Sequence, residues 1–141
     1  LLTDGFAQRN ATLSPDGRWL AYTSAETGTA EIFIRPFPAL DRKWLVSTHG
    51  GDGAHWSEDS RELLYVSRGP EGARLMSVTI DPAAASLTLP TPKELFVLDP
   101  RIVDLTPNAG HTRLLASRRI DDSDQNGVRV ILDWRAGVDS H

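Results

Sequence analysis

The stretch that decides the fold is LSPDGRWLAYTS, residues 13–24. Pro15 presets its φ for the second position of a type I turn, and Gly17 accepts a left-handed backbone conformation without steric cost. The residues that follow, from Trp19 to Ser24, are aromatic, apolar or hydroxylated, which is the composition of a β-strand. A tight turn followed directly by a strand predicts a β-hairpin.

The same phrase occurs again further along the chain. AHWSEDSRELLYVS, residues 54–67, aligns with ATLSPDGRWLAYTS, residues 11–24, at a spacing of 43 residues. A third and looser copy is VDLTPNAGHTRLLAS, residues 103–117. A period of about 40 to 50 residues built from strands is typical of the blades of a β-propeller. We therefore predict an all-β propeller with four-stranded antiparallel blades; a generic antiparallel sandwich is the alternative.

The strand pattern divides one domain, residues 1–141, into about three blades. Blade 1 is predicted at about 11–48, blade 2 at about 54–98 and blade 3 at about 101–134. Blade 3 lacks a recognisable fourth strand, and residues 1–3 resemble an outer strand without a blade, so they are candidates to complete it. Tryptophan usually serves as buried area. The four tryptophans, at 19, 44, 56 and 134, are therefore expected to pack between blades.

The composition is that of a folded globular protein and excludes several functional classes. Of the 141 residues, 40% are hydrophobic and 24% are charged, and the formal net charge is -4. An acidic chain disfavours nucleic acid as a partner. No apolar run is long enough to form a membrane-spanning helix. The absence of cysteine excludes disulfides, thiolate metal sites and a cysteine nucleophile.

Nearly the whole chain resembles the TolB-type, WD-like β-propeller repeat family, through the segments SPDGRWLAYTS, EIFIRPFP, KWLVSTHGG, HWSEDSRELLYVS, RLMSV and VILDW in that order. More narrowly, the chain resembles the C-terminal propeller sensor region of bacterial serine/threonine kinases. It implies a propeller of usually six blades that binds a protein partner or a small ligand. It also implies a periplasmic or extracytoplasmic location, and it brings no catalytic residue with it. The chain departs from the family in its second turn, Ser57-Glu58-Asp59-Ser60, and in having only about three blades.

Three blades form an open arc, because a propeller ring takes typically four to eight blades. The two terminal faces of an arc would expose apolar side chains, and a second copy related by a twofold axis would cover both. We therefore predict a homodimer that closes a six-bladed ring. The alternative is that the chain is a fragment of a longer protein.

One candidate ligand site is a recurring polar position. The residue two before the turn serine or threonine is polar in all three repeats, at Thr12, His55 and Asp104. On the inner strands these residues would form a polar ring at the channel mouth, where a small ligand could bind. The alternative is that they satisfy backbone N–H and C=O groups between blades.

A second candidate is a loop with the composition of a calcium-binding segment. Asp122, Asp124 and Asn126 match the first part of the calcium-loop template. The acidic twelfth residue, Asp133, falls within a predicted strand and lies too far along it to close the cage. We therefore expect at most weak calcium binding, and the same residue types also suit the tip of a solvated hairpin.

The sequence carries no recognisable catalytic motif. It has no G-x-S-x-G elbow, no phosphate-binding glycine loop and no HExxH pair. We therefore expect a non-catalytic propeller module for protein or ligand recognition, with no cofactor apart from the calcium considered above. Two alternatives stay open. One is the gate or sensor portion of a larger enzyme, such as a kinase or a prolyl oligopeptidase-like hydrolase; the other is a small-ligand or calcium-binding module.

Overall fold

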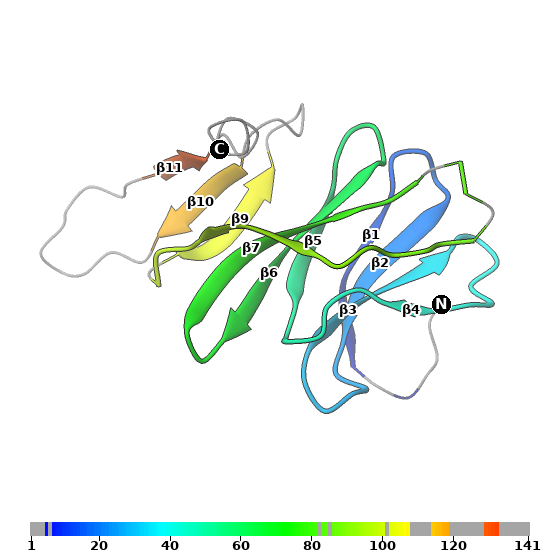
Figure 1. Ribbon diagram of the computed structural model, residues 1–141, viewed down its shortest axis with the longest axis horizontal. Helices are drawn as coiled ribbons and strands as arrows, with labels where there is room; N and C mark the ends of the chain where they lie inside the picture. Colours follow the sequence, from blue (N-terminus) through cyan, green and yellow to red (C-terminus); the bar gives the residue numbers. More distant parts are fainter. Residues whose placement is uncertain are drawn as a thin grey trace, which may run out of the picture.

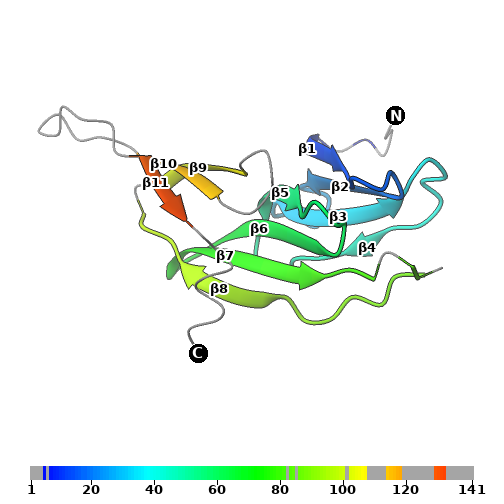
Figure 2. The same ribbon diagram turned by 90° about the horizontal axis from the view of Figure 1, so that it is seen from above.

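The computed structural model describes residues 5, 7–81, 83–84, 86–100, 102–107, 114–118 and 129–132. These residues form three antiparallel β-sheets that lie side by side (Figure 1). No helix occurs within the described ranges, which confirms the all-β prediction, and none of them therefore holds a helix able to cross a membrane. Figure 2 shows the same sheets turned by 90°, with β1 and β4 at opposite edges of the first sheet.

Each sheet is a meander whose strands pair in chain order. Blade 1 contains β1 (Gln8–Leu13), β2 (Trp19–Ser24), β3 (Glu31–Pro36) and β4 (Trp44–Leu45). Blade 2 contains β5 (Asp52–Trp56), β6 (Glu62–Gly69), β7 (Gly72–Thr79) and β8 (Lys93–Val97). The third sheet contains β9 (Ile102–Pro107), β10 (Leu114–Arg118) and β11 (Arg129–Leu132). The first two sheets are the predicted four-stranded antiparallel blades, and we call the third blade 3.

Blade 2 lies between the other two and is buried on both faces. Successive side chains of a strand point to opposite faces, and β6 shows the result most clearly. Leu63 and Tyr65 pack in the layer shared with blade 1, whereas Leu64 and Val66 pack in the layer shared with blade 3. All four are buried. The core is therefore two apolar layers, one on each side of blade 2.

Three of the tryptophans lie between blades 1 and 2, as the sequence predicts. Trp19 and Trp56 are buried in that layer, and Trp44 packs against it. The rings of Trp19 and Trp44 meet edge to face, with their centroids 5.8 Å apart. Such a pair contributes about 0.5 to 1.5 kcal/mol beyond the area that it buries. Trp134 lies outside the described residues.

The turn between the first two strands is held by the same hydrogen bonds in blades 1 and 2. Ser14 Oγ donates to Asp16 Oδ1 at 2.6 Å and accepts from Trp19 N at 3.0 Å. In blade 2, Ser57 Oγ donates to Asp59 Oδ1 at 2.6 Å and accepts from the backbone N–H of the first β6 residue at 3.0 Å. The departure noted in the second turn sequence therefore leaves its geometry intact, because the bonded serine and aspartate are both present.

Ser60 takes the place of Gly17 in the second turn. Both residues have a left-handed backbone conformation, with φ of 61° at Ser60 and 74° at Gly17. The Ser60 hydroxyl accepts a hydrogen bond of 3.0 Å from the backbone N–H of Asp16 in the first turn. The turns of the two blades are therefore bonded to each other.

The first strand of each blade carries a β-bulge. Pairing shifts between Arg9 and Thr12 in β1, and β5 shifts at the equivalent place, after Asp52. A shift also occurs where β9 pairs with β10. Asn10 and Gly53 have φ of 53° and 63°, the left-handed values that close these bulges. Because the bulges keep the chain in the sheet, β1 and β5 begin at residues 8 and 52, earlier than the predicted 11 and 54. A bulge also redirects side chains.

Candidate ligand-binding site

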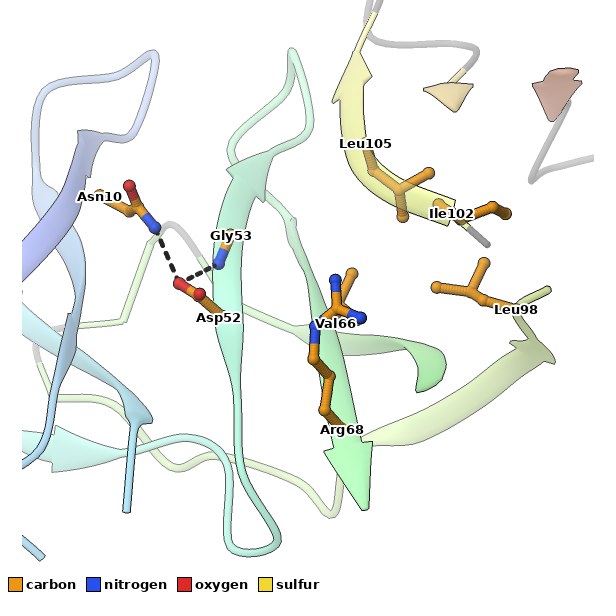
Figure 3. A pocket seen from close by; sticks show the side chains of 8 residues that line it. All are labelled: Asn10, Asp52, Gly53, Val66, Arg68, Leu98, Ile102 and Leu105. Carbon is orange, nitrogen blue, oxygen red and sulfur yellow. Dashed lines mark hydrogen bonds between the residues drawn. The ribbon is translucent and has the colours of Figure 1, made fainter. Parts of the chain in front are cut away.

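Two adjoining hollows lie at the end of the molecule where β1 and β5 begin. The outer hollow has a volume of about 470 Å³ and is lined by the start of β1, the β2–β3 and β4–β5 connections and the end of β6. The inner hollow, of about 100 Å³, is lined by residues of all three blades (Figure 3). Asp52, Val66 and Arg68 line both hollows. The two hollows therefore share one wall, and we call them together the mouth site.

Asp52 lies at the centre of this shared wall and is held by four donors. Its Oδ1 accepts from Asn10 Nδ2 at 2.8 Å, from Gly53 N at 2.9 Å and from Thr23 Oγ1 at 3.1 Å, and its Oδ2 accepts from Arg9 at 3.2 Å. Figure 3 shows the bonds from Asn10 and Gly53. Burial on its own would raise the pKa of the Asp52 carboxyl, but the donors together lower it below its usual value. Three of these donors converge on Oδ1 and one binds Oδ2, so most of the acceptor capacity of the Asp52 carboxylate is used within the protein.

Glu31 is the second carboxylate at the outer hollow, and it too is occupied by the protein. It is 4% exposed, at the start of β3. Its oxygens accept from Ser47 Oγ, from Gly50 N at 3.0 Å and from Thr29 Oγ1 at 3.4 Å. Both carboxylates of the mouth site are therefore largely occupied by donors of the protein itself.

Arg68 differs from the two carboxylates because its guanidinium is bonded to no described residue. Within the part of the chain that the structure describes, the Arg68 side chain makes no hydrogen bond and no ion pair. Figure 3 shows this side chain running back past Val66, with its guanidinium pointing into the inner hollow. The facing wall is formed by Leu98, Ile102 and Leu105, which are all buried. The mouth site thus places an exposed guanidinium, with no partner among the described residues, beside an apolar wall that is more than nine-tenths buried.

The predicted polar ring is used, in part, to join the blades. His55 Nε2 donates to the backbone O of Leu105 in blade 3 at 2.9 Å, and Trp56 Nε1 donates to the backbone O of Thr12 in blade 1 at 3.2 Å. Asp104 pairs with Ser117 in the third sheet, and its side chain lies outside the described residues. The contact of His55 agrees with the alternative interpretation, in which this position satisfies backbone groups between blades. A ligand role for the three residues stays a prediction.

The predicted calcium loop cannot be compared with the structure. Asp122, Asp124 and Asn126 lie outside the described residues. Elsewhere in the described part of the chain, no group of three or more potential metal ligands is gathered. Weak calcium binding at 122–126 therefore also stays a prediction.

The sequence analysis missed the mouth site, although part of its signal was available. The residues three positions before those of the predicted polar ring are Arg9, Asp52 and Arg101, which are all charged. A charge at the same place in every repeat marks the start of the inner strands, and Arg101 lies outside the described residues. Arg68 had no such signal, because the residue 43 positions earlier is Ala25. Only the folded arrangement of β6 brings Arg68 to this place.

The fold of the chain is that of known propellers. No family model matches the chain, and no curated protein matches it either. TolB from Acinetobacter baumannii superposes with a TM-score of 0.66 at 18% identity, covering 91% of this chain and 30% of that protein. A protein named as TolB from Agrobacterium tumefaciens gives 0.63 at 15% identity, covering 85% and 41%. One named as a 6-phosphogluconolactonase from Bacteroides uniformis gives 0.58 at 14% identity, covering 94% and 41%.

The chain therefore spans less than half the length of each of these proteins. At sequence identities below 20%, these likenesses show a shared architecture and say nothing about activity. Together with the two four-stranded antiparallel sheets, these likenesses confirm that the chain is a partial β-propeller with a TolB-like fold.

Proposed function

We propose that the chain is a non-catalytic β-propeller module that recognises a ligand or a protein partner at the mouth site. The observation that carries the proposal is the state of Arg68, whose guanidinium points into a hollow and is bonded to no described residue. A guanidinium presents five N–H donors in a fixed plane. Concave sites with a few convergent polar groups on an apolar lining are the usual form of ligand sites.

Peptide titration followed by NMR tests this proposal. A mixed set of short acidic, neutral and basic peptides is added to the ¹⁵N-labelled chain, and amide shifts are recorded. We expect the shifts to concentrate at residues 50–53 and 66–69, which line the mouth site. Shifts confined to the opposite end of the blades, around residues 14–18 and 57–61, would contradict the proposal.

We also propose that a second copy of the chain is a partner, closing a six-bladed ring. Leu63 and Tyr65 of blade 2 pack against blade 1. The residues 43 positions earlier, Leu20 and Tyr22, lie on the other face of β2 from the buried Ala21, and so on the outward face of blade 1. These are the positions with which blade 2 packs against its neighbour, and in blade 1 the tyrosine is covered by Arg35, whose Nε donates to the Tyr22 hydroxyl at 2.9 Å.

An enzyme is the alternative function, because one of the similar structures is named as a 6-phosphogluconolactonase. Asp52 and Arg68 would then be the groups nearest to a substrate in the mouth site. A lactonase assay on the purified chain separates the two functions. If the chain hydrolyses the lactone and the Asp52→Asn variant does not, the chain is an enzyme and the binding-module proposal is wrong.

A further inference from the structure

The charges of the mouth site favour an anionic ligand. The carboxylates of Asp52 and Glu31 are both occupied by donors of the protein itself. Arg68 keeps all of its donors free within the described residues, and the guanidinium of Arg9 donates to Asp52 Oδ2 at 3.2 Å. Among the charged donors that line the mouth site, those left for a ligand are the guanidinium groups of Arg68 and Arg9. A planar carboxylate matches a guanidinium through two parallel hydrogen bonds.

The apolar wall adds a second requirement. Leu98, Ile102 and Leu105 stand opposite the Arg68 guanidinium across the inner hollow (Figure 3). That hollow has a volume of about 100 Å³. An apolar cavity of about 150 Å³ accommodates benzene, so the inner hollow by itself suits a branched aliphatic group better than an indole ring.

We infer that the ligand of the mouth site carries a carboxylate next to a small aliphatic group, the first bound by Arg68 and the second by the wall of the inner hollow. The inference rests on the proposed function and names the chemistry of its ligand. Two sources offer this chemistry. One is the C-terminus of a polypeptide that ends in leucine or valine, and the other is a free branched-chain carboxylic acid.

Calorimetric titration with matched probes tests the inference. The probes are acetyl-Gly-Gly-Leu with a free carboxylate, the same peptide as its C-terminal amide, acetyl-Gly-Gly-Trp, and 4-methylpentanoate. A hydrogen-bonded charge pair is worth about 1.5 to 3 kcal/mol, and each 1.4 kcal/mol is tenfold in affinity. We therefore expect the leucine carboxylate to bind about 10- to 100-fold more tightly than its amide, and more tightly than the tryptophan peptide. If the leucine peptide binds and 4-methylpentanoate does not, the ligand is the end of a polypeptide. If 4-methylpentanoate binds and the peptide does not, the ligand is a small acid.

Two variants assign the binding to Arg68. Arg68→Gln should lose the preference for the carboxylate, while its urea unfolding midpoint stays that of the unmodified chain. Arg61→Gln is the matched control, because Arg61 is an exposed arginine just before the opposite end of the same strand, β6. We expect Arg61→Gln to bind every probe as the unmodified chain does.

Three results would overturn the inference. The first is equal affinity for the carboxylate and the amide, with amide shifts at residues 50–53 and 66–69. In that case the proposed site stands and only its ligand chemistry is wrong. The second is that inorganic phosphate displaces a bound probe at the same concentration as the leucine peptide does. Such a result would show that the ligand needs no aliphatic group. The third is no shift at the mouth site with any probe or peptide, which removes the proposed function as well.

Discussion

Ser60 shows how one residue can both carry strain and compensate for it. Its φ of 61° lies in the left-handed region, which costs a residue with a β-carbon roughly 1 to 2 kcal/mol. Its hydroxyl accepts the hydrogen bond from Asp16 N in the neighbouring blade, and such a bond contributes about 1 kcal/mol net. The bond between the two turns therefore offsets most of the strain. A glycine at this position would have neither the backbone strain nor the hydrogen bond.

The first prediction separates the two contributions of Ser60. Ser60→Ala keeps the strained conformation and loses the bond, so we expect the free energy of unfolding to fall by about 1 kcal/mol. Ser60→Gly loses the bond and relieves the strain, so its effect should be near zero. Urea unfolding followed by tryptophan fluorescence measures both. Equal losses in the two variants would mean that the backbone conformation of Ser60 costs nothing.

The second prediction concerns the titration of Tyr65. Burial, and to a smaller extent the nearby Glu31 carboxylate, raises the pKa of the Tyr65 phenol to about 12. Its unfolded pKa is about 10, so folding favours the neutral phenol. This contribution to stability is fully present below pH 10 and is lost as the pH rises through about 12. In Tyr22→Phe, which leaves Tyr65 as the only tyrosine, tyrosinate absorbance should appear with a midpoint near 12. A midpoint near 10, with the circular dichroism of the folded chain retained, would contradict the prediction.

Single residues of the candidate site were the hardest to predict from sequence. The recurring position of Thr12 and His55 was visible because polar residues stand there amid apolar neighbours. That signal does not distinguish a ligand contact from a bond to a backbone carbonyl, and His55 makes the latter. Arg68 is one of several charged residues at the end of a strand, and nothing in its neighbours marks it. Its role depends on which blade lies across the hollow.

At the scale of elements, the sequence predicted strands well and strand starts poorly. The phrase from Ser14 to Ser24 and its copy from Ser57 to Ser67 contain the turn residues and the apolar runs that define β2 and β6. The starts of β1 and β5 were missed because the residues concerned, Gln8 to Asn10 and Asp52 to Gly53, are polar or turn-forming. These residues stay in the sheet through bulges closed by Asn10 and Gly53. Polar, turn-forming residues inside a strand are what a bulge requires.

The third prediction concerns the connection from β4 to β5. A β-carbon at Gly51 would lie 2.5 Å from Ser47 Oγ and 2.9 Å from Ile32 Cγ1. Ile32 is fully buried, and overpacking of this kind costs about 1 to 3 kcal/mol. We expect Gly51→Ala to lower the free energy of unfolding by that amount in urea unfolding. The control is Gly69→Ala, since a β-carbon there meets nothing within 4 Å. A Gly51→Ala variant as stable as Gly69→Ala would show that the connection moves freely.

At the scale of the whole molecule, the fourth prediction is a homodimer. The outward face of blade 1 carries Leu45, which pairs with Phe33 and is 42% exposed. We expect light scattering to give the mass of two chains at micromolar concentration, and Leu45→Asp to give the mass of one. Val97→Asp is the control, because Val97 is 62% exposed but pairs with Arg74 at the outer edge of blade 2. A single-chain mass for the unmodified protein at all these concentrations would contradict ring closure.

The position of blade 2 between two apolar layers has a consequence for the order in which backbone amides open. Opening β6 disrupts both layers at once, whereas opening β2 disrupts only the layer between blades 1 and 2. Amide hydrogen exchange reports such local openings. In dilute solution, exchange should be slowest from residue 63 to residue 66 and faster in β2. If two chains close a ring at higher concentration, blades 1 and 3 each gain a second neighbour, as blade 2 already has, and this difference in protection should disappear as the concentration rises.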